Sequence, residues 1–232
     1  MPKGEIQVLG KSLIERHING LNRVGITDIA LVTGYKAEMI QYPNLLKFNN
    51  SNYESTNMIY SLSIAKSFID DDIVILYSDI LLDDSVYDKF KKFEHNIEIL
   101  VDKNWVSYWR LRFGEKINQD LEGLIVEGTE IISIGMNSDL RIENIDGRFV
   151  GVVYISKKKI HLLTDIEINY PNYRTIDFTG YLSFLISKGE KLNAFWIEGG
   201  WYEIDTDSDY EIFTDNSLIA VNKLMKIGLN LK

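Results

Sequence analysis

Residues 73–79 read Ile73-Val74-Ile75-Leu76-Tyr77-Ser78-Asp79, an apolar run of the β type that stops at a carboxylate. A second short run of this kind, residues 201–206, carries Asp205 near its end. In open α/β sheets ligands bind outside the carboxyl ends of the strands, where two acids on separate strands could hold one Mg²⁺ on a polyphosphate. An Asp after a strand is also a common turn residue or helix cap, so the pattern alone leaves both interpretations open.

Helical and strand patterns alternate along the chain and predict an α/β fold. Ser12 and Glu15 have the spacing of a capping box, and the helix they begin ends at Gly25. The β-α-β order of the first half favours a mostly parallel, mixed sheet covered on both faces, and antiparallel additions follow after Val101. We predict a single domain over residues 1–232. The predicted strands are residues 29–33, 73–79, 97–101, 124–127, 130–134, 149–155 and 192–197, and further helices are predicted at 57–66, 86–93, 178–187 and 217–226.

The composition excludes several classes of function. A formal charge of −9 argues against nucleic acid binding, which requires clustered Lys and Arg. No apolar segment approaches the roughly 20 residues needed to cross a bilayer, and the first residues lack the layout of a signal peptide. With no cysteine, the sequence excludes disulfides, thiolate catalysis and Cys-based zinc sites. We therefore expect a cytoplasmic protein without a nucleic acid or membrane partner, for which a homodimer is allowed.

Aromatic and basic residues gather in the segment 102–112, directly after a predicted strand. It contains Asp102, Trp105, Trp109 and Arg112, and Trp201 adds an aromatic ring near the second acid. One interpretation is an aromatic corner that packs on the sheet. The other is a ligand wall, because aromatic faces attract alkylammonium groups and arginine grips phosphate with two hydrogen bonds. A small substrate with a cationic head and a phosphate would use both.

Short motifs of one family occur in order from residue 2 to about residue 213. They make the chain similar to the nucleotidyltransferases, and most of all to the small cytidylyltransferases of the LicC type, which activate phosphocholine or aminoethylphosphonate. The matching segments are Pro2-Lys3 with Gly10 to Arg16 (PK…V.GK.LLER), Val32 to Tyr35 (VTGY), Asn52 to Leu62 (N..Y..TN…SL), Tyr77 to Asp79 (YGD, with Ser78 for glycine), Asp102 to Arg112 (D..W…W..R), Gly151 to Ser156 (GL.KFS) and Trp201 to Thr206 (W.EIDT).

The resemblance implies a three-layer Rossmann-like fold with a site for a nucleoside triphosphate. Asp79 and Asp205 would hold Mg²⁺, and Lys3 would contact the phosphates. Asn57 would lie near the nucleotide, although its spacing alone favours a helix cap.

The resemblance also divides the chain by role. Residues 1–101 would form the nucleotide-binding half, 102–216 the acceptor-binding half, and 217–232 a C-terminal helix. The residues expected to face the phosphorylated acceptor are Asp102, Trp105, Trp109, Arg112 and Trp201.

One family feature is missing from these 232 residues. In the family, a first strand and a Gly-rich loop (AAG.G.R) precede the PK pair, but here Pro2-Lys3 follows Met1. That strand is central, so its absence should leave unpaired ladder groups on both neighbouring strands and an empty core position. We consider three explanations: a shortened version of a longer gene product, another segment such as 217–231 or a second chain in that position, and a relative that no longer turns over.

Three functions follow as hypotheses. The first is Mg²⁺-dependent transfer of CMP from CTP to a small phospho-alcohol or phosphonate, such as phosphocholine or 2-aminoethylphosphonate, with release of pyrophosphate. This chemistry depends mainly on positioning and charge neutralisation and needs little help from a protein base. The alternatives are a non-catalytic binding or regulatory domain and a sugar-1-phosphate nucleotidyltransferase.

Overall fold

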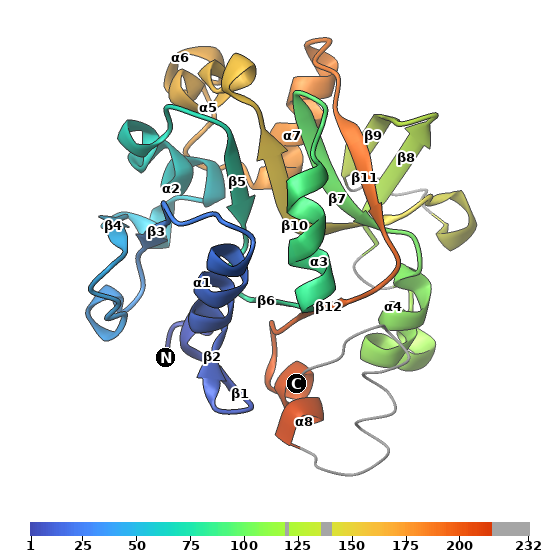
Figure 1. Ribbon diagram of the computed structural model, residues 1–232. Coiled ribbons are helices and arrows are strands. Elements are labelled where there is room, and N and C mark those ends of the chain that lie inside the picture. Colours follow the sequence, from blue (N-terminus) through green and yellow to red (C-terminus); the bar gives the residue numbers. More distant parts are fainter. Residues whose placement is uncertain (119–120, 136–140, 215–232) are drawn as a thin grey trace.

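The computed structural model describes residues 1–118, 121–135 and 141–214, arranged in three layers (Figure 1). A six-stranded sheet forms the middle layer. Its strands, in spatial order, are β5 (Ile73–Leu76), β10 (Arg148–Ile155), β7 (Ile97–Asp102), β11 (Asn193–Ile197), β9 (Glu130–Gly135) and β8 (Gly123–Glu127). Helices α1 (Leu13–Arg23) and α3 (Asp84–Lys89) cover one face, and α2 (Met58–Ile64), α5 (His161–Thr164), α6 (Ile166–Asn169) and α7 (Phe178–Ser187) cover the other. The predicted three-layer α/β class is confirmed.

The central strand β7 separates two hydrophobic cores. Successive side chains of a strand point to opposite faces. Leu100 accordingly packs in the core under α1 and α3, whereas Ile99 and Val101 pack in the core under α2 and α7. All six residues of β7 are buried, which explains why the run Ile99-Leu100-Val101 lacks the alternation of a half-exposed strand.

The strand pairings are mixed, as predicted, but mostly antiparallel rather than mostly parallel. Of the five pairings described in the large sheet, the one between β7 and β11 is parallel. The reason is β10, which comes from the second half of the chain and inserts antiparallel between β5 and β7. A register shift between Phe149 and Val153 bends β10, and Gly151 sits there at a φ of 82°. A Cβ on Gly151 would lie 2.9 Å from the Tyr77 ring, so the position requires glycine.

A second, smaller sheet stands apart from the large one. Strands β3 (Ala30–Thr33) and β4 (Leu46–Asn49) pair parallel to each other and lie to the left of β5 in Figure 1. Among the described residues, no strand lies between β3 and β5. The strand that the resemblance places between them is therefore not found within residues 1–118, 121–135 and 141–214.

The capping and turn signals located several elements well. The Ser12 side chain accepts a hydrogen bond from the Glu15 N–H at the start of α1, and Asp177 caps α7 in the same way. The predicted hairpin at 124–134 is the β8–β9 pair. The predicted helix at 217–226 lies outside the described residues. The remaining elements are the hairpin β1 (Gln7–Val8) and β2 (Lys11–Ser12), the strands β6 (Ile80–Leu82) and β12 (Trp201–Glu203), the helices α4 (Trp105–Phe113) and α8 (Asp207–Thr214), and short 3-10 turns.

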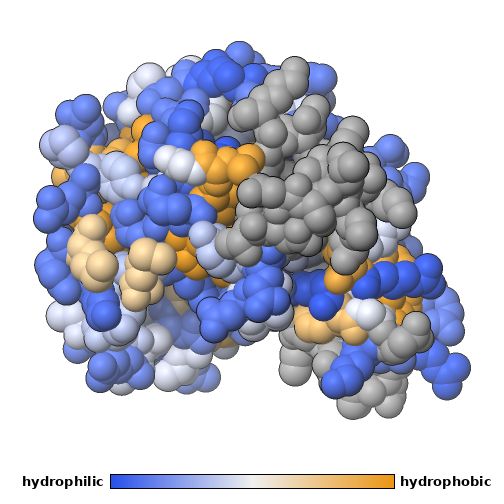
Figure 2. Space-filling view, turned by 90° about the horizontal axis from the view of Figure 1, so that it is seen from below, coloured by the Kyte–Doolittle hydropathy of each residue, from blue (hydrophilic) through white to orange (hydrophobic). Residues whose placement is uncertain are grey.

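One face of the molecule shows how hydrophilic and hydrophobic residues are distributed on the surface (Figure 2). Hydrophilic residues dominate the face seen in Figure 2, with apolar surface visible between them. In the part of the chain that the structure describes, we find no helix long and apolar enough to span a membrane.

Candidate active site

Two short strands at the lower end of the sheet in Figure 1 bring Asp79 and Asp205 together. β6 pairs antiparallel with β12, and Ile80 lies opposite Glu203. Asp79 directly precedes β6 and Asp205 closely follows β12, so antiparallel pairing places both acids at the same end. The Ile204 N–H donates to the Asp79 carbonyl oxygen at 2.9 Å and extends the pairing toward the two acids.

The Lys3 ammonium group lies between these carboxylates. Its Nζ donates to Asp205 Oδ1 at 2.7 Å and to Asp79 Oδ2 at 3.3 Å. Lys3 is held by a 3-10 turn packed closely on α1, where a Cβ on Gly4 would lie 2.8 Å from Ile14. Burial works against the charge of Lys3, but the two carboxylates outweigh it and raise the pKa of the ammonium group. The three predicted phosphate- and metal-binding residues therefore meet at one point.

Arg112 of α4 binds the same cluster from the other side. Its Nε and Nη2 donate to the two oxygens of Asp209 at 2.8 and 3.0 Å, and its Nη1 donates to Glu203 at 2.7 Å. Nη2 also donates to Asp205 Oδ2 at 2.7 Å. Asp209 in turn accepts the backbone N–H groups of Asp205 and Thr206, which fixes the chain around the second acid. Asp205 is therefore oriented by protein groups on both of its oxygens.

This hydrogen-bonded cluster contains more carboxylates than cations. Four acids share Lys3 and Arg112: Asp79, Glu203, Asp205 and Asp209. Burial, reinforced by the neighbouring Asp205, raises the pKa of Glu203 to about 7. Burial also raises the pKa of Asp79 against the pull of Lys3. If all four acids ionise, they exceed Lys3 and Arg112 by two negative charges, of which the nearby Arg148 offsets a part at Glu203; a divalent cation would neutralise the rest.

The donor set at Asp79 and Asp205 fits Mg²⁺. Mg²⁺ prefers oxygen ligands and is usually bound through one or two carboxylates together with substrate phosphates and water. The Lys3 ammonium group already occupies a cation position between both carboxylates, as a stand-in for such an ion. Within the described residues, no group of three or more His, Cys, Asp or Glu is arranged to hold a metal by itself. The pair therefore suits an ion that arrives with a phosphate-bearing ligand.

Asn57 caps a helix, as its spacing indicated. Its Oδ1 accepts the Met58 N–H at 2.8 Å at the start of α2, and its own N–H donates to the Arg174 carbonyl oxygen. A contact between Asn57 and the nucleotide stays a prediction.

The aromatic cluster forms a packed corner. Asp102 accepts hydrogen bonds from Trp201 Nε1 at 2.9 Å and from the backbone N–H groups of Gly199 and Asn104 at 2.8 and 2.9 Å. Asp102, Trp105, Trp109 and Trp201 each expose 2% of their surface or less. These four side chains offer no surface to a ligand in this conformation, and their contact with an acceptor stays a prediction. Arg112, the fifth residue of this group, is committed to the acids.

Comparison with known proteins tests the resemblance found in the sequence. No family model matches the chain. The chain is 29% identical over 230 residues to the CTP:phosphoglutamine cytidylyltransferase of Campylobacter jejuni, covering 91% of this chain and 90% of that protein. The predicted relationship to the nucleotidyltransferases is confirmed.

Solved structures show the same fold. The inositol-1-phosphate CTP transferase from T. maritima superposes with a TM-score of 0.70 at 17% identity, covering 100% of this chain and 90% of that one. LicC, the CTP:phosphocholine cytidylyltransferase from Streptococcus pneumoniae, gives a TM-score of 0.68 at 21% identity, covering 91% and 87%. These two structures show that the chain has the fold that the motifs implied.

Sequence reasoning missed the participation of Glu203 and Asp209 in this nucleotidyltransferase-like site. Neither residue was among the site residues that the sequence predicted. One signal was available: Glu203 and Asp205 are two residues apart on a strand-like run, so they face the same side. No local signal links Arg112 to Asp209, which are 97 residues apart.

Proposed function

We propose that this protein is a Mg²⁺-dependent cytidylyltransferase that transfers CMP from CTP to a small phosphorylated acceptor. The observation that carries the proposal is the convergence of Asp79 and Asp205 on one cation, Lys3 Nζ, at 3.3 and 2.7 Å. The 29% identical relative is a cytidylyltransferase over nearly the same length, which supports both the reaction and the nucleotide.

In this reaction, an ionised phosphate oxygen of the acceptor attacks the α-phosphorus of CTP. The new P–O bond forms as the bond from the α-phosphorus to the α–β bridging oxygen breaks, and pyrophosphate leaves with the electron pair. A bound Mg²⁺ would supply charge neutralisation to the phosphates, held by Asp79 and Asp205. No protein base is required, because the attacking oxygen carries no proton to remove.

The other residues of the cluster position these groups. Lys3 is 48% exposed at its side chain, so its flexible stem can carry the ammonium group from the carboxylates to the triphosphate. Arg112 is only 6% exposed and remains fixed to Glu203, Asp205 and Asp209. We infer that Arg112 orients the second acid and that Lys3 exchanges partners during the reaction.

For the acceptor, we propose a small phosphate or phosphonate compound with a polar organic group. The acceptors named for these relatives are phosphoglutamine, phosphocholine and inositol-1-phosphate, which share the attacking phosphate and differ elsewhere. The buried aromatic corner gives no support to a preference for choline. A panel of these three compounds with 2-aminoethylphosphonate and glucose-1-phosphate would rank the classes. The highest kcat/KM with glucose-1-phosphate would favour the sugar-1-phosphate alternative.

The decisive test replaces each acid with its amide. We expect Asp79→Asn and Asp205→Asn each to lower Mg²⁺-dependent pyrophosphate release from CTP and acceptor by at least about a thousandfold, because both remove a charged metal ligand at the transferring phosphate. Asp207→Asn is the matched control, since Asp207 is an exposed acid two residues beyond Asp205 and outside the cluster. Activity that survives both substitutions would remove the central assignment.

A second candidate is a binding domain without turnover, favoured by the absence of a strand between β3 and β5 in the described part of the chain. Titration calorimetry on the 232-residue chain separates the two. Tight binding of Mg·CTP supports the enzyme, and acceptor binding without Mg·CTP binding supports the second candidate. The same proposal includes the roles of residues 1–101 and 102–216, a cytoplasmic location and a homodimer. Mutations in each half of the chain would test the roles, and localisation and sedimentation would test the other two.

A further inference from the structure

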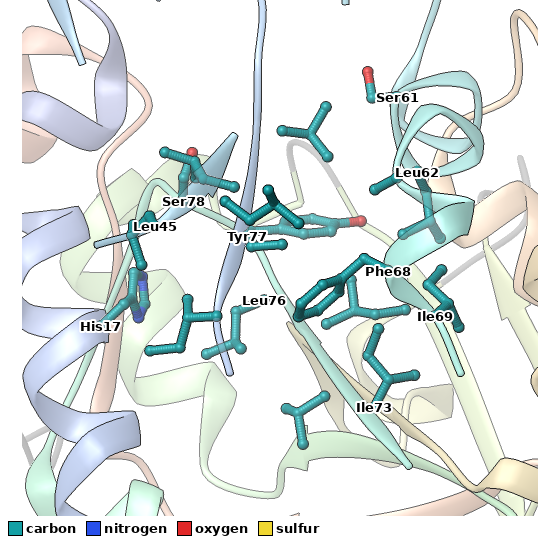
Figure 3. A pocket seen from close by; sticks show the side chains of 18 of the residues that line it. His17, Leu45, Ser61, Leu62, Phe68, Ile69, Ile73, Leu76, Tyr77 and Ser78 are labelled. Atoms are coloured by element: carbon teal, nitrogen blue, oxygen red, sulfur yellow. The ribbon is translucent and has the colours of Figure 1, made fainter. Parts of the chain in front are cut away.

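Two cavities in the described part of the chain differ in their lining. The one between β3 and β5 has a volume of about 860 Å³ and is lined mainly by apolar side chains, among them Leu62, Ile69 and Leu76 (Figure 3). The other has a volume of about 670 Å³ and is lined in part by the cations Lys89 and Lys103. A cavity of this size holds a small organic ligand, and the two lysines suit a ligand with an anionic group.

This second cavity, called the β8–β11 cavity below, lies beside the end of β11. Residues 196–200 of β11 and of the turn after it line the cavity. Val126 and Gly128 at the end of β8, and Val86 and Lys89 of α3, complete much of the lining. Figure 1 shows β11 between α3 and β8. The cavity is therefore formed by three elements that are distant in the sequence.

The strand pairing of β11 ends where the cavity begins. All five residues of β11 pair with β7, but on its other edge the registered pair with β9 is Asn193 with Glu130. The Ala194 N–H donates to the Thr129 carbonyl oxygen at 2.8 Å. The turn at Gly128, which has a φ of 66°, then leads into β8, and β8 lies beyond β9 in the sheet. After Ala194, this edge of β11 has no strand partner among the described residues.

The peptide groups of Trp196 point toward this opening. In a parallel pair, successive residues direct their N–H and C=O groups alternately toward one neighbouring strand and the other. The Ile197 carbonyl oxygen accepts the Lys103 N–H at 2.9 Å, so Ile197 faces β7, whereas the Ala194 N–H faces β9. Trp196 precedes Ile197 and therefore faces away from β7. Its N–H and C=O offer a donor beside an acceptor, which complements the donor and acceptor along the edge of a nucleobase.

The charged side chains of the cavity suit the rest of a nucleotide. Neither Lys89 nor Lys103 has an ion-pair partner among the described residues. Asp146 Oδ2 accepts the Val126 N–H at 2.8 Å, which commits this acid to the fold. Glu198 is exposed at the cavity. Lysine ammonium groups bind phosphate, and a carboxylate accepts hydrogen bonds from the hydroxyl groups of a ribose.

We propose that the β8–β11 cavity is a second nucleotide site, which binds a nucleoside 5′-phosphate without a divalent cation. The edge of the base pairs with the N–H and C=O of Trp196. Glu198 accepts hydrogen bonds from the ribose hydroxyls, and the phosphate binds Lys89 and Lys103. No lining residue of this cavity belongs to the hydrogen-bonded cluster of the candidate active site, so the inference goes beyond the proposed transfer reaction.

The first experiment titrates AMP and CMP separately into the 232-residue protein in buffer with EDTA, by isothermal calorimetry. Both bases place an amino donor beside a ring-nitrogen acceptor. We expect saturable binding of at least one of the two. Ribose 5-phosphate, which lacks the base, should bind at least about tenfold more weakly than that nucleotide, a difference of about 1.4 kcal/mol. Saturable binding of neither nucleotide would overturn the proposal, and so would an equal affinity for ribose 5-phosphate, which would indicate a phosphate site only.

A second experiment tests whether the cavity holds the nucleotide. The double substitution Lys89→Gln with Lys103→Gln should weaken the bound nucleotide at least about tenfold, because it removes both cations at the phosphate. Lys92→Gln is the matched control, since Lys92 is an exposed lysine of the 3-10 turn after α3 and does not line the cavity. The nucleotide should also slow amide hydrogen exchange in residues 196–200. Unchanged affinity in the double variant, or unchanged exchange in residues 196–200, would overturn the proposal.

A third experiment separates this cavity from the candidate active site. The double substitution Asp79→Asn with Asp205→Asn should leave the affinity for the nucleotide in EDTA unchanged, because neither acid lines the β8–β11 cavity. A loss of affinity of tenfold or more would place the nucleotide at the two acids and would overturn a second site. The failure of the proposed function is distinguishable, because it would appear as absent pyrophosphate release while metal-free nucleotide binding persists.

Discussion

Asp102 and the pair Asp79–Asp205 look alike in the sequence but are held by different kinds of partner. Asp102 is 1% exposed, and three N–H groups of the protein, from Trp201, Gly199 and Asn104, donate to it. The Asp79 and Asp205 side chains are 21% and 34% exposed and share one ammonium group. What the three acids share is that each lies at or close to the end of a strand.

The nature of the partner indicates the role of each acid. N–H groups of backbone and indole are fixed parts of the fold and cannot leave without unfolding it. The Lys3 ammonium group is on a flexible stem and can be exchanged for another cation. We therefore propose that Asp102 stabilises the aromatic corner and that the Asp79–Asp205 pair binds ligand, a contrast that the following substitutions test.

The largest effect on stability is expected from Asp102→Ala. It leaves the Gly199 N–H and the Trp201 indole N–H buried without an acceptor, at about 1–3 kcal/mol each, and the part-buried Asn104 N–H unpaired, so we expect a loss of roughly 3–5 kcal/mol in the free energy of unfolding. Urea denaturation measures it. Asp79→Asn should change stability by less than about 1 kcal/mol, since its partner is a half-exposed lysine. Equal losses for the two variants would break the contrast.

A somewhat smaller loss is expected from Arg112→Gln, which acts within the charged cluster. Arg112 and Asp209 are 6% and 3% exposed at their side chains, so the substitution leaves a buried carboxylate without its cation. We expect a loss of about 3 kcal/mol. Asp209 keeps its bonds from the Asp205 and Thr206 N–H groups, which limits the loss. Arg110→Gln, exposed on the same helix, is the control, and its unfolding free energy should be unchanged.

The contrast also explains how much the sequence could predict. Local signals located many elements: the capping residues Ser12 and Asn57, the hairpin of β8 and β9, and the strand β5. These signals depend on residues that are close together in the chain, so they can be read directly from the sequence. The convergence of Asp79 with Asp205 followed from motifs rather than from local pattern.

The rest depends on contacts between distant segments. The insertion of β10 between β5 and β7 changed a mostly parallel expectation into mostly antiparallel pairing, and nothing in the local alternation reports it. The partner of Asp102 is likewise remote, because Trp201 is 99 residues away. The sequence looks the same for a strand-end acid that binds N–H groups and for one that binds a lysine. Only the three-dimensional structure distinguishes their roles.

A moderate effect of pH is expected from Glu203, because burial raises the pKa of this carboxyl group from 4.5 to about 7. The folded state then binds a proton between pH 4.5 and 7 that the unfolded state has released, so this group's contribution to stability falls as the pH rises through that range. In metal-free buffer, Glu203→Gln should remove a decline on the order of 2 kcal/mol. The measurement is the difference between the unfolding free energies of the two proteins at each pH.

The comparison between the two proteins is needed because His17 also changes the stability with pH. Burial lowers its pKa to about 4, so its contribution is present above pH 6.5 and is lost as the pH falls toward 4. This slope is opposite to that of Glu203 and occurs in both proteins, so it cancels in the difference. A difference that does not change with pH would show that Glu203 is ionised throughout, with Arg112 dominating over burial.

The smallest effect is expected from Lys3→Met, and it addresses the exchange of cations directly. Lys3 and a divalent cation compete for the same two carboxylates, so removing the ammonium group should strengthen Mg²⁺ binding to the nucleotide-free protein. Exposed ion pairs are worth up to about 1 kcal/mol, which limits the gain to about fivefold in Kd. Calorimetric titration with Mg²⁺ measures it, and Lys11→Met, an exposed lysine outside the cluster, is the control. Weaker Mg²⁺ binding in Lys3→Met would mean that the lysine orients the carboxylates for the metal, as Arg112 orients Asp205, instead of occupying the metal position.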